Sequence, residues 1–161
     1  MQQLKNNTIK GIIAFLFCGS LYSIIEFIWK YNSESKLSWS MFVLSGLVGI
    51  ISWFCNETIF TYETDYLIQV IYCASWTILG EWTFGYIFNR DFSIWDYRSL
   101  PLTFADGQLN IFFCIAWALL IAIIIPILDY IDWKYFDYMK RTPPYYVIHG
   151  KVVYQMKNKT E

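Results

Sequence analysis

Two glutamates lie inside strongly apolar parts of this sequence. Glu26 stands in the run SLYSIIEFIWK, and Glu81 stands in the run ILGEWTFGYIF. A charge at the centre of a bilayer costs about 3 kcal/mol even on the most lenient scale, so such residues face protein or water. Two carboxylates around one cavity could bind a cation or a small solute, or take part in acid–base chemistry.

Each glutamate also has a purely structural interpretation. Glu26 could pair with Lys30, which lies four residues further along the same helix face. Glu81 could be uncharged and hydrogen-bonded across a helix interface. The sequence leaves both interpretations open.

Enzymatic chemistry finds little support in the other residue types. No nucleophile or metal-ligand cluster accompanies the glutamates, and the one histidine, His149, falls outside the apolar runs. The four cysteines form no CxxC pair, so we interpret them as packing residues. There is no glycine-rich phosphate loop, and a net charge of −1 argues against nucleic acid as a partner. We expect no enzyme activity, no catalytic residue, no metal and no cofactor.

A second polar stretch directly precedes the last long apolar run. Residues 93–110 have the sequence SIWDYRSLPLTFADGQLN. Trp95 and Tyr97 suit a membrane interface, and the Asp96 carboxylate can accept hydrogen bonds from backbone amides or from a nearby tryptophan or arginine. Polar backbone at membrane depth is tolerated only where it is buried in protein or lines a cavity. We expect an ordered extracytoplasmic cap over a polar cavity, the alternative being a loop that only anchors the helices.

The overall composition is that of a membrane protein. Of the 161 residues, 57% are hydrophobic, 21% are aromatic and only 16% are charged, against about 25% charged in soluble domains. A soluble domain of this size could not bury so much apolar surface in one core. A bilayer can cover that surface, with tryptophan and tyrosine as interfacial anchors.

Four apolar segments are long enough to cross the roughly 30 Å hydrocarbon core as helices of about 20 residues. We expect these spans at about residues 11–30, 38–54, 66–88 and 111–130. The predicted fold class is therefore an all-α membrane protein, with a bundle of four transmembrane helices in residues 1–138. Pro126 in the last segment predicts a kink or loosened final turns.

The distribution of lysine and arginine predicts the orientation. With four spans both termini share one side, and basic residues are twice as frequent there as on the other. We therefore predict a multi-pass protein of the inner (cytoplasmic) membrane with both termini in the cytoplasm. The residues compared are Lys5, Lys10, Lys134, Lys140, Arg141, Lys151, Lys157 and Lys159 on that side, and Lys30, Lys36, Arg90 and Arg98 on the other.

Residues 139–161 form the predicted short cytoplasmic tail. Two runs, YYVI and KVVY, flank the dipeptide His149–Gly150, a pattern typical of a tight β-hairpin. His149 is expected to be a turn residue. An isolated two-stranded hairpin is marginal in water, so this one would rest on the lipid surface, on the bundle or on a partner.

The polar stretch also carries a family resemblance. IWDYRSLP, followed by a glycine, a glutamine and the apolar run NIFFCIAWALL, resembles the ABC-transporter type IV family, small bacterial membrane proteins with a W-D-Y-S-x-L-P segment before their last core helix. Glu26 and Glu81 stand where the helices of that family place glutamates. The matching residues of the polar stretch are Trp95, Asp96, Tyr97, Leu100, Pro101, Gly107 and Gln108.

The chain also departs from the family pattern. Arg98 replaces the usual serine, Thr103 stands about where asparagine is expected, and one extra residue separates Pro101 from Gly107. The Y-G-P segment of the family is missing. The resemblance implies a bacterial membrane component, such as a permease-like subunit, without a defined substrate.

We therefore expect an integral membrane component of a transport system, with a polar intramembrane site for a small or cationic solute. Its partners would be the lipid bilayer and either an ATP-binding subunit or further copies of the chain. The alternative is a non-transport sensor, scaffold or stress effector that recruits a partner. The candidate substrate-binding residues are Glu26, Glu81, Trp95, Asp96, Tyr97 and Arg98.

Overall fold

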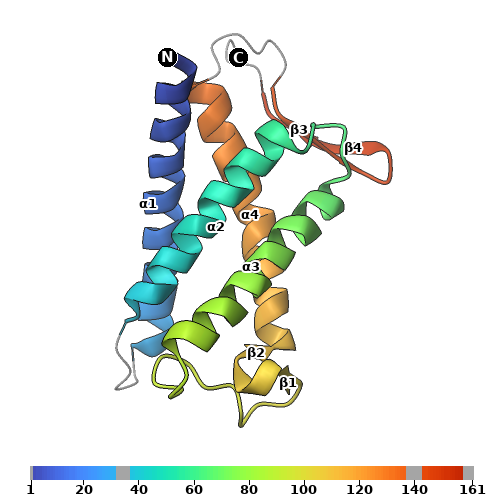
Figure 1. Cartoon of the computed structure of the whole chain (residues 1–161). Helices are drawn as coiled ribbons and strands as arrows, with labels where there is room; N and C mark the ends of the chain where they lie inside the picture. The colour runs from blue at the N-terminus through green and yellow to red at the C-terminus, as the bar shows by residue number, and fades with distance from the viewer. Residues whose placement is uncertain (1, 32–36, 137–142, 158–161) are drawn as a thin grey trace.

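The computed structural model describes residues 2–31, 37–136 and 143–157. Most of this part of the chain is helical, which confirms the predicted helical fold. Successive helices run in opposite directions, so α1 begins and α4 ends at the same end of the bundle (Figure 1). The helices are α1 (Gln2–Lys30), α2 (Trp39–Thr58), α3 (Tyr66–Phe88) and α4 (Ile111–Tyr135).

The helix bounds differ from the predicted spans at several ends. α1 begins before residue 11, α2 continues past residue 54 and α4 continues past residue 130. Two helix starts have a clear local cause, because Asp65 and Asn110 each accept a hydrogen bond from the backbone N–H two residues later. These caps satisfy amide groups that have no partner within the helix.

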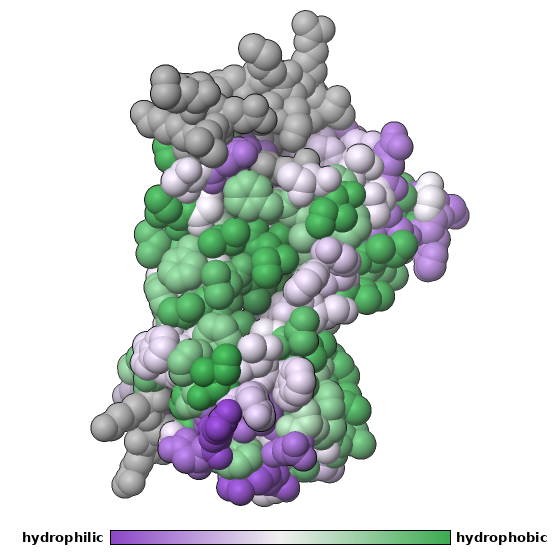
Figure 2. Space-filling view, in the orientation of Figure 1, coloured by the Kyte–Doolittle hydropathy of each residue, from purple (hydrophilic) through white to green (hydrophobic). Residues whose placement is uncertain are grey.

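Two helices, over Asn6–Lys30 and Ile111–Tyr135, are long and apolar enough to cross a membrane. Only 22% and 28% of the residues in their most apolar stretches are buried inside the protein, whereas a helix in the core of a soluble protein is buried all round. Figure 2 shows a hydrophobic band across one face, between hydrophilic patches at the two ends. The apolar part of α2 is shorter, over Trp39–Cys55, so four membrane spans remain a prediction.

The membrane orientation also remains a prediction. Of the basic residues on which it depends, Lys36, Lys140, Arg141 and Lys159 lie outside the described residues. The same is true of residues 139–142 and 158–161 of the predicted tail.

Helix packing leaves one side of the bundle open. α1 packs closely on α2, where a Cβ atom on Gly49 would lie 2.7 Å from the carbonyl oxygen of Ala14, so only glycine permits this approach. α4 packs on α2 and α3 and touches α1 at few points. One of those contacts is a buried ion pair, 2.6 Å between Lys10 Nζ and Asp132 Oδ1, near the ends of the two helices.

Residues 89–110, called the cap below, close the other end of the bundle between α3 and α4. The cap contains a short ladder of β1 (Thr103–Phe104) with β2 (Leu109–Asn110) and a 3₁₀ turn, η1 (Ala105–Gly107), between them. It lies at the bottom of the view in Figure 1.

Antiparallel strands β3 (Tyr145–Ile148) and β4 (Lys151–Gln155) form a hairpin that projects sideways from the opposite end (Figure 1). His149 and Gly150 both have positive φ, 49° and 75°, as the common two-residue turn requires. The His149 N–H donates to Asp65 Oδ2 at 2.7 Å, and this bond holds the pKa of the exposed carboxyl group below its ordinary value. The hairpin therefore rests on the start of α3.

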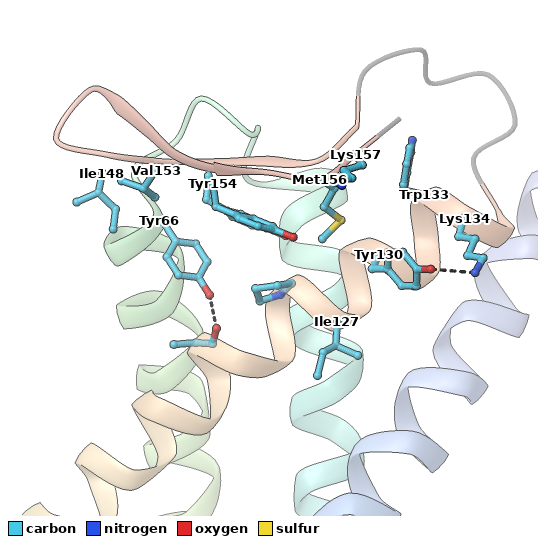
Figure 3. Close-up of a pocket in the computed structure, with 13 residues that line it drawn as sticks. Tyr66, Ile127, Tyr130, Trp133, Lys134, Ile148, Val153, Tyr154, Met156 and Lys157 are labelled. Carbon is cyan, nitrogen blue, oxygen red and sulfur yellow. Dashed lines mark hydrogen bonds between the residues drawn. The ribbon is translucent and has the colours of Figure 1, made fainter. Parts of the chain in front are cut away.

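The helical course of α4 through Pro126 depends on a contact from α3. Proline has no N–H, so the carbonyl oxygen of Ala122, four residues earlier, loses its helical donor. The Tyr66 hydroxyl donates a hydrogen bond to this oxygen (Figure 3). The carbonyl oxygen that proline leaves without a helical donor is therefore satisfied from the neighbouring helix, and α4 continues to Tyr135.

The Tyr66→Phe variant should lower the free energy of unfolding by about 1–3 kcal/mol, because the Ala122 carbonyl would stay buried without a donor. The measurement is denaturant unfolding in detergent micelles, followed by circular dichroism. Tyr86→Phe is the matched control, since the Tyr86 side chain is 62% exposed. In a Pro126→Ala background, residue 126 has a backbone N–H that can donate to the Ala122 carbonyl. The loss of unfolding free energy caused by Tyr66→Phe should therefore be smaller in that background. Equal effects in both backgrounds would show that the tyrosine does not compensate for the proline.

Candidate functional site

Glu81 is the most deeply buried carboxylate of the predicted site, with 1% of its surface exposed. The Tyr97 hydroxyl donates to Glu81 Oε1 at 3.1 Å, and the indole N–H of Trp117 donates to Oε2 at 3.0 Å. The Trp117 ring stacks on Tyr22, with centroids 4.9 Å apart. One carboxylate of α3 therefore holds two aromatic side chains, from the cap and from α4, in fixed positions.

Glu26 has different partners at the end of α1. Its Oε1 atom pairs with Lys30 Nζ at 2.8 Å, and its Oε2 atom accepts from the backbone N–H of Ser38 at 3.4 Å. Lys30 Nζ also lies 3.4 Å from the carbonyl oxygen of Ile94 in the cap. The pair is largely buried, with 6% of the glutamate side chain and 16% of the lysine side chain exposed. The interaction ties α1 to the start of α2 and to the cap.

A cavity of about 260 Å³ lies beside these groups, between α1 and α4 and under the cap. We call it the α1–α4 cavity. Glu26 and Lys30 provide its charged groups. Its aromatic wall consists of Tyr22, Trp29, Trp95, Tyr97, Phe113 and Trp117.

Two amide side chains attach the cap to α3. Asn89 Nδ2 donates to the Trp95 carbonyl at 2.7 Å and to Gln108 Oε1 at 3.1 Å, while its Oδ1 accepts from the Ile94 N–H at 2.8 Å. Gln108 Nε2 donates back to the Asn89 carbonyl at 2.9 Å. A Cβ atom on Gly85 would lie 2.5 Å from Gln108 Oε1, so the network needs glycine at that position.

This network holds a cap whose backbone is strained. Phe92, Leu102, Ala105 and Asp106 all have φ between 51° and 60°. Left-handed backbone costs roughly 1–2 kcal/mol for each residue other than glycine. A loop with such a backbone keeps one conformation only where surrounding contacts hold it in place. The cap is therefore an ordered structure and not a flexible connection.

Asp96 and Arg98 do not line the α1–α4 cavity. They pair with each other, 2.7 Å between Asp96 Oδ2 and Arg98 Nη2, with 41% and 57% of their side chains exposed. The hydrogen bonds from Arg98 lower the pKa of Asp96 to about 2. The guanidinium group also lies 3.9 Å from the ring centre of Phe92. The pair stabilises the outer turn of the cap.

The predicted site residues therefore separate into three groups. Glu26, Trp95 and Tyr97 line the cavity, Glu81 lies behind its aromatic wall, and the Asp96–Arg98 pair lies outside it. Nothing in the sequence distinguishes Trp117 and Tyr22, because aromatic residues are frequent throughout this chain. Among the described residues, no group of three or more His, Cys, Asp or Glu side chains could hold a metal ion.

Comparison with known proteins gives no match. No protein-family model, curated protein or solved structure is significantly similar to this chain. The resemblance to the ABC-transporter type IV family therefore depends on the residues quoted above alone.

The Glu81→Leu variant should lower the free energy of unfolding by about 1–3 kcal/mol for each donor that it leaves unpaired. Glu81→Gln should cost less than half as much, because its amide oxygen can accept from Trp117 and its amide nitrogen can donate to Tyr97. Denaturant unfolding in micelles measures both. Equal losses in the two variants would mean that the hydrogen bonds to Glu81 do not hold the aromatic wall.

Proposed function

We propose that this protein is an integral membrane component of a transport system, a permease-like subunit that binds a small cationic solute in the α1–α4 cavity. The observation that carries the proposal is the combination of aromatic walls with the Glu26 carboxylate in one cavity. Aromatic faces attract cations, most strongly where water is excluded. A carboxylate adds a full opposite charge. The proposed role is binding and passage of a solute, without catalysis.

Lys30 shows how a cation is accommodated there. Its ammonium group lies against Glu26 and the carbonyl oxygen of Ile94, at the edge of the cavity. A solute cation can take this place while the flexible lysine side chain turns towards water. Glu26 then stays paired throughout the exchange, which avoids the cost of an uncompensated buried charge.

We propose further that all four helices cross the inner (cytoplasmic) membrane, with both termini in the cytoplasm. The stretch of α4 from Ile111 to Leu128 has no charged residue and is about 26 Å long at 1.5 Å per residue. α2 and α3 run between the same two ends of the bundle as α1 and α4 (Figure 1), so they would lie at the same depth. The excess of basic residues in the terminal segments supports the orientation.

The Glu26→Gln variant should weaken binding of benzyltrimethylammonium at least about tenfold, because the carboxylate charge is lost inside a cavity with a largely apolar lining. Isothermal titration in micelles measures the affinity. Neopentylbenzene has the same shape without the charge and should bind more weakly than the cation. The Glu26→Gln variant should not change its affinity. Asp96→Asn is the matched control, since it removes a carboxylate outside the cavity. Equal affinity of Glu26→Gln and the unsubstituted protein for the cation would remove Glu26 from the site.

A second function, partner recruitment by a membrane anchor, is favoured by a separate observation. Every residue of β4 is exposed, and Val152, Val153 and Tyr154 each have more than half of their surface accessible. An exposed strand edge with apolar side chains is a ready surface for another chain. In this alternative the polar side chains of the bundle serve packing alone.

One experiment distinguishes the two proposed functions. The protein is purified from its native membrane in mild detergent, and the associated chains are identified by mass spectrometry. The transport proposal predicts a stoichiometric ATP-binding subunit or a homo-oligomer that binds the cation. A different protein partner that is lost when β4 is altered by Val152→Asp and Tyr154→Asp would favour recruitment. The unsubstituted protein and Lys151→Gln, at the hairpin turn, are the controls.

A further inference from the structure

We infer that the groove between the β3–β4 hairpin and α4 binds an anionic phospholipid. This groove, called the hairpin groove below, has a volume of about 1020 Å³ and lies at the opposite end of the bundle from the cap. It is distinct from the α1–α4 cavity. Its described lining is mainly aliphatic and aromatic, and its charged members are Lys134 and Lys157.

The face of α4 that contributes Ile127, Tyr130 and Lys134 to the groove changes from aliphatic to basic along the helix. Leu119, Ile123, Ile127, Tyr130 and Lys134 follow one another at spacings of four, four, three and four residues, which places them on one side of the helix. Lys134 lies about 17 Å along the helix axis from Ile123. The order, aliphatic then aromatic then basic, matches the order of acyl chain, interface and phosphate in a bilayer leaflet.

The hairpin supplies the opposite wall, which also ends in a basic residue. Val153 and Tyr154 present apolar and aromatic surface, and Lys157 follows them. In Figure 3, Lys157 and Lys134 lie towards the end of the groove that carries Trp133, and Ile148 and Val153 lie towards the other end. Two cationic groups from separate elements can therefore meet one phosphate, with the apolar tails between α4 and the hairpin.

Charge complementarity identifies the occupant. The described lining contains no acidic residue, and the two carboxylates nearest along α4 already have partners. Asp129 Oδ2 accepts from the Tyr146 hydroxyl at 2.7 Å, and Asp132 pairs with Lys10. Among the residues that the structure describes, no carboxylate therefore compensates the positive charge of the groove.

Continuity with the outer surface of α4 favours a lipid over an acidic peptide. Leu119 and Ile123 are 63% and 59% exposed and continue the face of the groove towards the middle of the helix. A peptide would leave this surface uncovered, whereas acyl chains extend along it. Phosphatidylglycerol is the suitable probe because it has one net negative charge, and phosphatidylcholine is the neutral comparison.

The test measures lipid retention by native mass spectrometry after exchange into micelles that contain equal amounts of the two lipids. The unsubstituted protein should retain phosphatidylglycerol roughly tenfold better than phosphatidylcholine. Lys134→Gln/Lys157→Gln should lose this preference. Arg90→Gln/Lys151→Gln, which removes the same charge outside the groove, should keep it. Equal retention of both lipids by the unsubstituted protein, or equal losses in the two double variants, would overturn the inference.

A second measurement uses the unsubstituted protein and so does not depend on the folding of a variant. Phosphatidylglycerol with a photoreactive acyl chain should crosslink to residues of the groove, such as Ile127 and Val153, in proteoliposomes. Crosslinks confined to other faces of the bundle would overturn the inference.

Discussion

Polar groups inside this apolar bundle have to find partners within the protein. Where helices are surrounded by lipid, burial of apolar side chains gives no drive for helix association, so polar contacts and close packing fix the arrangement. The Glu81 carboxylate shows this most clearly, because its two hydrogen bonds join α3 to α4 through Trp117 and to the cap through Tyr97. The Tyr66 hydroxyl joins α3 to α4 in the same way at Ala122.

The same requirement explains why the two ends of the molecule differ. At the cap end, Asn89 and Gln108 satisfy each other and the surrounding backbone, and the loop is held in a strained conformation. At the hairpin end, individual hydrogen bonds connect the hairpin to the bundle, such as the bond from Tyr146 in β3 to Asp129. A large groove remains between the hairpin and α4. One end is therefore closed by polar bonds, and the other contains an open groove.

The location of the α1–α4 cavity follows from helix packing. Gly49 lets α1 approach α2 closely, and this contact draws α1 away from α4 over much of its length. Large aromatic side chains wall the gap, and hydrogen bonds to Glu81 hold two of them, Tyr97 and Trp117, in place. In the proposed function, Glu81 acts through the position of this wall, and Glu26 is the group that meets the solute.

The sequence by itself determined the helical class and the approximate positions of the four helices, and it included the pairing of Glu26 with Lys30 as one of two interpretations. These features depend on hydrophobic periodicity and on neighbours three or four residues apart, which are local properties of the chain. The sequence also marked Glu81 and Tyr97 as noteworthy polar groups, without showing that they bond to each other.

Only the tertiary structure decided which of these groups share a cavity. Asp96 and Arg98 adjoin Tyr97 in the sequence, yet their side chains pair in solvent while the Tyr97 side chain turns inward. Trp117 lies 36 residues from Glu81 along the chain, and no spacing rule connects residues so far apart. Side-chain direction in an irregular cap and contacts between distant helices depend on packing of the whole bundle, and that information is not local to any segment.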